Sequence, residues 1–135
     1  MNQIDGRARR ILVVDDEPSV RTFVERALAN NGYEAILVAD GPEALAVAEH
    51  RGPFDLFVID VMMPKMKGDE LARRIRQREP EARILYFTGY SDQLFEERHA
   101  LWEHEAFLEK PVTVKGLLEA VSLLLYGHVR SDHSA

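Results

Sequence analysis

Cysteine is absent from the 135-residue chain, which excludes disulfide scaffolds, thiolate metal sites and cysteine nucleophiles. Positive charge is also scarce: 17 basic against 23 acidic residues give a net charge of −6, which argues against direct binding of nucleic acid. No apolar run approaches the roughly 20 residues of a membrane span, and the N-terminal arginines precede no signal-peptide core. These absences predict a cytoplasmic protein that binds no membrane.

Two kinds of apolar pattern alternate along the chain. Continuous short runs predict buried strands at 11–14, 35–38, 54–59, 84–87 and 106–108. Helical spacing predicts helices at 20–28, 42–50, 71–75, 94–102 and 114–125. The alternation predicts an α/β fold, a doubly wound five-stranded parallel sheet in the flavodoxin-like order 2-1-3-4-5 with five helices. Residues 9–126 are expected to form the domain, and residues 1–8 and 127–135 its tails.

Polar residues follow the apolar runs where a doubly wound sheet binds its ligands. Asp15 and Asp16 follow the first run, Asp60 the third, Thr88 the fourth and Lys110 the fifth. In the predicted strand order the first and third strands are neighbours. The three aspartates are therefore expected to lie together, with the lysine and the threonine close by.

Several of these residues also have a purely structural interpretation. Asp15 or Asp16 could cap the first helix, and Asp40, followed by Gly-Pro-Glu, is best read as a helix cap. Thr88 or Lys110, taken alone, could be an ordinary surface residue. Asp60 is different, because the next helical pattern starts several residues later and leaves it no helix to cap.

Three carboxylates in one crevice repel one another unless their pKa values rise or a cation holds them. Oxygen ligands without histidine or cysteine favour a hard ion, with Mg²⁺ first. A carboxylate nucleophile, a divalent ion, a lysine and a hydroxyl form a site suited to phosphoryl transfer.

Four segments resemble the receiver domain of two-component response regulators: ILVVDDE, DLFVIDVMMPKMKGDEL, ILYFTGY and AFLEKP. The resemblance extends from about residue 10 to residue 125. It implies that Asp60 is the phosphoacceptor and forms an aspartyl phosphate. It also implies that Mg²⁺, or Mn²⁺, is held by Asp15, Asp16, Asp60 and the backbone carbonyl of Met62.

The same resemblance implies the parts of a conformational switch. Lys110 would contact the phosphoryl group, and Thr88 would move toward it. Phe107 stands where the family keeps an aromatic residue that changes rotamer together with the threonine. The peptide bond between Lys110 and Pro111 is expected to be cis.

The resemblance further implies a signalling protein rather than an enzyme. The only reactions that it would catalyse are its own phosphorylation and its own dephosphorylation. The expected partner is a histidine kinase or a histidine phosphotransfer protein. A homodimer or an effector would use the surface of residues 94–102, 106–108 and 114–125. The FTGYSD and AFLEKPVT stretches resemble receivers of hybrid histidine kinases, in either a stand-alone protein or part of a longer one.

Two rival functions are weighed against this one. A small Mg²⁺-dependent phosphatase with an aspartyl nucleophile usually has a second aspartate two residues later, where this chain has Met62. A flavodoxin-like FMN carrier needs a phosphate-binding loop where this chain has three consecutive acids.

The chain also departs from the receiver pattern at several positions. Glu103-His104 replaces a common Gly-Ala, so the fourth helix is expected to end without a glycine cap. Met62 and Tyr90 stand where they would affect the lifetime of the acyl phosphate.

Overall fold

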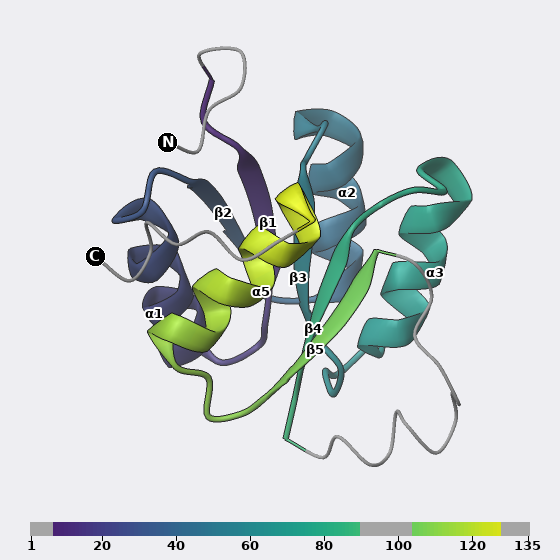
Figure 1. Ribbon diagram of the computed structural model, residues 1–135. Coiled ribbons are helices and arrows are strands. Elements are labelled where there is room, and N and C mark those ends of the chain that lie inside the picture. Colours follow the sequence, from purple (N-terminus) through teal and green to yellow (C-terminus); the bar gives the residue numbers. More distant parts are fainter. Residues whose placement is uncertain (1–6, 90–103, 128–135) are drawn as a thin grey trace.

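A parallel five-stranded sheet forms the centre of the protein, shown as a computed structural model in Figure 1. The structure describes residues 7–89 and 104–127. The strand order is β2-β1-β3-β4-β5, which confirms the predicted sheet. The strands are β1 (Arg10–Val14), β2 (Glu34–Val38), β3 (Leu56–Asp60), β4 (Ile84–Thr88) and β5 (Glu105–Glu109).

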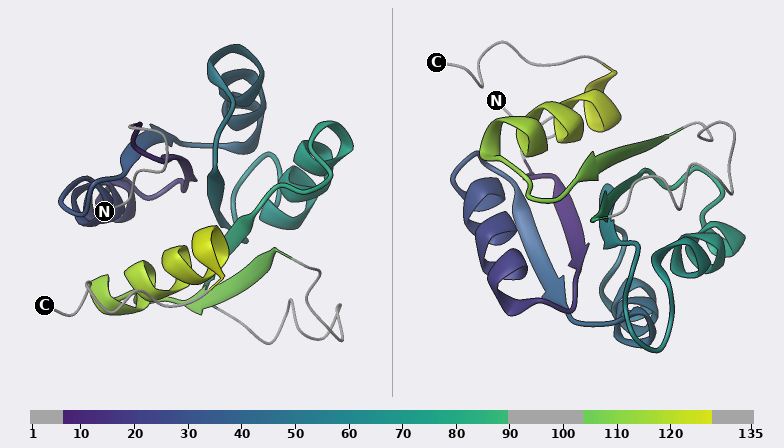
Figure 2. Two further views of the ribbon diagram at one scale, coloured as in Figure 1. Left: turned by 45° about the horizontal axis from the view of Figure 1, so that its top comes forward. Right: turned by 90° about the horizontal axis from the view of Figure 1, so that it is seen from below.

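Helices cover both faces of this sheet (Figure 2). The described ranges contain four of them: α1 (Pro18–Ala29), α2 (Gly41–Arg51), α3 (Gly68–Arg78) and α5 (Val114–Tyr126). Helices α1 and α5 pack together on one face, and α2 and α3 on the other. The helix predicted at 94–102 lies outside the described residues, as do Tyr90 and Glu103. Among the helices that are described, none is long and apolar enough to cross a membrane.

The apolar runs are unbroken because the central strands are buried on both faces. All five residues of β3 and of β4 are buried. Alternate apolar side chains of the central strands β1, β3 and β4 enter one of two separate apolar cores, since successive residues of a strand point to opposite faces. The sheet therefore holds its strand ends in fixed positions, which is what a site built at those ends requires.

The ends of two helices follow their sequence signals. Asp40 caps α2, with its carboxylate accepting a hydrogen bond from the Glu43 amide at 2.9 Å. Gly127 ends α5 in the left-handed conformation, at φ 80°, and its amide donates to the Leu123 carbonyl. The structural reading of Asp40 as a cap is therefore confirmed.

Two expectations near the site need correction. Neither Asp15 nor Asp16 is the N-cap of α1, because that residue is Glu17, whose side chain makes no capping bond. Asp15 still contributes at this helix start, since its Oδ1 accepts a hydrogen bond from the Glu17 amide at 2.9 Å. Asp60 is the last residue of β3, as expected, but the strand begins at Leu56, so Phe54 lies outside it. The predicted run was shifted toward its N-terminal end because Phe54 is buried without being part of the ladder.

Residue His104, where the chain departs from the common Gly-Ala pattern, has a positive φ of 67°. Histidine is among the non-glycine residues that adopt this left-handed region more readily than most. Its carbonyl accepts a hydrogen bond from the Ile84 amide at 2.8 Å, which joins the start of β5 to β4. The end of the fourth predicted helix lies outside the described residues.

Candidate functional site

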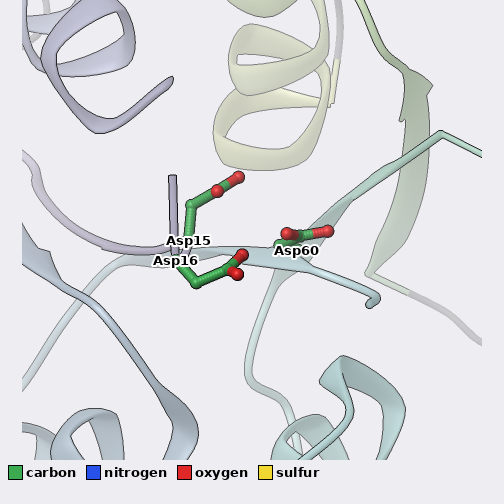
Figure 3. Close-up of side chains that lie close together, drawn as sticks. All are labelled: Asp15, Asp16 and Asp60. Atoms are coloured by element: carbon green, nitrogen blue, oxygen red, sulfur yellow. The ribbon is translucent and has the colours of Figure 1, made fainter. Parts of the chain in front are cut away.

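Three aspartates meet at the carboxyl edge of the sheet, where β1 and β3 end (Figure 3). One carboxylate oxygen each from Asp15, Asp16 and Asp60 lies within 4.8 Å of the others. Asp15 and Asp60 are buried, and Asp16 is exposed. The three predicted acidic site residues therefore do come together, as the neighbouring positions of β1 and β3 require.

The ammonium group of Lys110 joins this cluster from the loop after β5. Its Nζ atom lies 3.2 Å from Asp15 Oδ2 and 3.4 Å from Asp60 Oδ2. The Lys110 amide donates to the carbonyl of Thr88 at 2.8 Å, which ties the loop to the end of β4. The bond from Lys110 to Pro111 is cis, as the resemblance implies.

Glu17 also takes part in the site, although no role was predicted for it from the sequence. Its Oε1 atom lies 2.7 Å from Lys110 Nζ, closer than either aspartate. The hydrogen bond to Lys110 lowers the pKa of Glu17. A signal was present in the sequence, because Glu17 directly follows the two acids expected to bind the metal.

Burial and mutual repulsion set the charge state of the aspartates. Loss of solvent around Asp60 and the nearby charge of Asp15 raise the pKa of Asp60 to about 7, against the opposing effect of Lys110. Burial likewise raises the pKa of Asp15. For Lys110, burial opposes the charge, but Glu17, Asp15 and Asp60 outweigh it and raise the pKa. The cluster thus holds more negative charge than one lysine neutralises.

The carboxylates keep oxygen atoms available for a ligand. Asp15 Oδ1 accepts from the Glu17 amide at 2.9 Å, and Asp60 Oδ1 accepts from the Met62 amide at 3.2 Å. Asp15 Oδ2 is buried, and within the described ranges no hydrogen-bond donor reaches it in good geometry, although Lys110 is near. An all-oxygen set with such an oxygen fits a hard divalent cation.

Thr88 and Phe107 lie on neighbouring strands on one face of the sheet. Thr88 is the buried last residue of β4 and is paired with Glu109, while Tyr86 is paired with Phe107. Residues two apart on a strand share a face, so Thr88, Tyr86 and Phe107 all face the core of α2 and α3. The half-buried ring of Phe107 stacks on that of Tyr86, with centroids 5.2 Å apart.

Gly68, the first residue of α3, packs directly against the strand end that carries Asp60. A Cβ atom there would lie 2.4 Å from the Asp60 carbonyl oxygen and 2.9 Å from Ile59 Cγ2. The Gly68 amide donates to the Val61 carbonyl at 2.8 Å. The absence of a side chain lets α3 begin close to the site.

Gly68→Ala is expected to lower the free energy of unfolding by about 1–3 kcal/mol, because backbone atoms must move to admit the methyl group. Urea unfolding measures this change. Gly89→Ala is the matched control, since no described atom lies within 4 Å of a Cβ at Gly89. Equal effects of the two substitutions would contradict the close packing at Gly68.

Both the sequence and the fold of this chain match a known protein family. The family model described as "Response regulator receiver domain" matches residues 11–122. The sensor kinase CckA of Brucella abortus is 35% identical over 116 residues, which cover 85% of this chain and 12% of that kinase. The chain thus spans a small part of that relative's length.

Solved structures show the same likeness. The receiver domain of the hybrid histidine kinase CckA matches with a TM-score of 0.73 and 37% identity, over 86% of this chain and 98% of that one. The response regulator TrrA of Thermotoga maritima, in complex with Mg²⁺-BeF, matches with a TM-score of 0.76 and 35% identity, over 87% of this chain and 99% of that one. These matches give no support to the phosphatase alternative. The chain belongs to the family of response regulator receiver domains.

Proposed function

We propose that Asp60 accepts a phosphoryl group from the phosphohistidine of a histidine kinase or a histidine phosphotransfer protein. A carboxylate oxygen of Asp60 would form the new P–O bond while the P–N bond to histidine breaks. The observation that carries this proposal is the position of Asp60, at the end of a central buried strand, among two further carboxylates and within 3.4 Å of Lys110. Receiver domains are signalling switches, and they interact with partners of this kind.

The proposal includes a divalent ion, Mg²⁺ or Mn²⁺, held by Asp15, Asp16, Asp60 and the backbone carbonyl of Met62. The all-oxygen donor set and the buried Asp15 Oδ2 support this assignment. When bound, the ion neutralises oxygens of the transferring phosphoryl group. The chain itself aims Asp60 and supplies the second positive charge through Lys110.

Lys110, Thr88 and Phe107 carry the conformational part of the proposal. Lys110 would leave Glu17 to contact the phosphoryl group, and the Thr88 hydroxyl would turn toward the same oxygens. Phe107 would then change rotamer on the same face of the sheet. Phosphorylation would in this way shift the population between two arrangements of the domain.

The affinity for Mg²⁺ is expected to depend on pH. Because the pKa of Asp60 is about 7 without metal, binding below pH 7 must displace a proton. The dissociation constant should fall about tenfold per pH unit up to pH 7 and level off above it. Calorimetric titration in buffers of different ionisation enthalpy counts the released protons.

The same pKa predicts the stability of the metal-free protein. A carboxyl group whose pKa is raised on folding binds more protons folded than unfolded, so stability falls as pH rises from about 4 to 7. Added Mg²⁺ should remove this loss. An affinity and a stability that both stay constant across this range would contradict the charge state assigned to Asp60.

Residues 9–126 would form the receiver domain, with tails at 1–8 and 127–135, and we place its action in the cytoplasm. The proposed contact for a homodimer or an effector consists of β5 and α5, together with residues 94–102, which lie outside the described part of the chain. On α5, Leu123 is 48% exposed, which supports a contact there. Tyr126 supports it less, because the guanidinium of Arg9 already lies over its ring. The likeness to the CckA receiver favours a phosphorelay role.

The first experiment incubates the purified chain with acetyl phosphate and Mg²⁺ and measures its intact mass. One added phosphoryl group, absent when EDTA replaces Mg²⁺, is the expected result. Repeated turnover of assorted phosphomonoesters without stable labelling would instead favour the phosphatase function.

A further inference from the structure

A buried polar network lies on the same face of the sheet as Phe107 and Thr88. It is found where β4 and β5 begin, whereas the aspartates lie where strands end. It consists of Arg76 on α3, Tyr86 on β4 and Glu105 on β5. We propose that these three residues are positioning residues for Phe107: they hold the Tyr86 ring in place and so limit how readily Phe107 leaves its resting arrangement. This inference rests on the proposed function of Phe107.

Glu105 is the centre of the network. Its side chain is 0% exposed, and the Arg76 guanidinium, 8% exposed, forms a close ion pair with Glu105 Oε2. A second nitrogen of Arg76 donates to the Ala82 carbonyl at 3.0 Å. A buried carboxylate costs free energy unless it is paired and hydrogen-bonded. The need for this pairing holds Arg76 and Glu105 firmly in place.

The hydroxyl group of Tyr86 links this ion pair to the aromatic stack. It donates to Glu105 Oε2 at 3.2 Å, and the Tyr86 side chain is fully buried. A hydrogen bond to a charged acceptor is stronger than one between neutral groups. The ring is therefore fixed at its hydroxyl end by Glu105 and at its backbone end by the central part of β4.

The fixed ring of Tyr86 forms one wall of the Phe107 site. The two rings stack at 5.2 Å with an interplanar angle of 26°. The strand register places Glu105, Phe107 and Glu109 opposite Ile84, Tyr86 and Thr88, in that order. The polar network, the stacked rings of Tyr86 and Phe107, and Thr88 thus follow one another along a single face of the sheet. Because the two rings are in direct contact, a fixed Tyr86 ring restricts the movement of Phe107.

A purely structural role would need only bulk at position 86, which phenylalanine supplies equally well. The hydroxyl group adds orientation, because its bond to Glu105 is lost if the ring tilts. Tyr86→Phe keeps the ring and removes only this bond, which separates orientation from packing. Tyr33→Phe is the matched control, since Tyr33 is also buried but belongs to the core on the other face.

The test uses ¹⁹F NMR of the full chain in which 4-fluorophenylalanine is placed at position 107 alone, through an amber codon. The chain has six phenylalanines, and labelling this one position keeps the other five, and those added by Tyr86→Phe and Tyr33→Phe, free of fluorine. Beryllofluoride with Mg²⁺ gives the reference position of the activated state. In Tyr86→Phe without beryllofluoride, we expect this resonance to move toward the activated position, with a change of up to about tenfold in the population ratio.

Arg76→Lys keeps the charge but loses the planar fork, and it is expected to move the Phe107 resonance in the same direction by less. An unmoved resonance in Tyr86→Phe, or an equal movement in Tyr33→Phe, would overturn the inference. Failure of the proposed function is distinguishable: beryllofluoride would then leave the Phe107 resonance of the unmodified chain in place.

Discussion

Asp60→Asn is expected to abolish phosphoryl incorporation from acetyl phosphate entirely. The amide nitrogen and oxygen of asparagine are poor nucleophiles, and the substitution removes one of the three charges that gather at the site. Intact mass after incubation with acetyl phosphate and Mg²⁺ measures the outcome. Because the ionised Asp60 repels Asp15, the variant should also be more stable than the parent without metal, above the Asp60 pKa of about 7.

Asp40→Asn is the control for this substitution. Asp40 also follows a strand, β2, but it caps α2, and asparagine caps helices about as well as aspartate. This variant should incorporate the phosphoryl group like the parent chain. Persistent labelling of the Asp60 variant, with its fold verified by the stability gain, would contradict the assignment of the phosphoacceptor.

Arg76→Met is expected to lower the free energy of unfolding by about 3–5 kcal/mol. Methionine replaces most of the apolar stem of the arginine but leaves Glu105, with its side chain at 0% exposure, without its close ionic partner. An uncompensated buried carboxylate must either keep its charge in a poor environment or take up a proton, and both cost stability. Urea unfolding at neutral pH measures the loss.

The same helix supplies the matched control. Arg74 forms an ion pair at 2.9 Å with Glu70, which lies one helical turn before it, but both side chains are at least 40% exposed. Such exposed pairs contribute about 0.3–0.5 kcal/mol, so Arg74→Met should change stability little. Similar losses in the two variants would show that the burial of the Arg76–Glu105 pair contributes nothing of its own.

The sheet could be predicted from the sequence because burial on both faces leaves a signal that does not depend on distant residues. Unbroken apolar runs such as Ile11 to Val14 mark strands between two helical layers. The strand order follows from the fold class, and that order alone predicts that Asp15 and Asp60 lie together. The error at Phe54 arose because burial alone does not distinguish a strand from the loop that precedes it.

Long-range polar contacts could not be predicted in the same way. Glu17 is separated from Lys110 by most of the chain, and their 2.7 Å contact depends on how the loop after β5 folds over the start of α1. Glu105 directly precedes the apolar run at 106–108 and has no predicted role, and only the packing of α3 against the sheet reveals Arg76 as its partner. No periodicity records such pairs, because each depends on a single side chain.

The contact between Lys110 and Glu17 also suggests how the resting state is maintained. The lysine is held by three carboxylates, so under the role proposed for Lys110 an incoming phosphoryl group would have to compete with Glu17 for it. The more tightly Glu17 holds Lys110, the smaller the population of the activated arrangement before phosphorylation.

The most direct test of the central claim is to locate the modified residue. The chain is treated with acetyl phosphate and Mg²⁺, the acyl phosphate is trapped by borohydride reduction, and the product is sequenced by tandem mass spectrometry. Reduction converts a phosphorylated aspartate to homoserine. We predict homoserine at position 60 alone, and none when Mg²⁺ is removed with EDTA. Homoserine at another aspartate, or at position 60 regardless of Mg²⁺, would contradict the account.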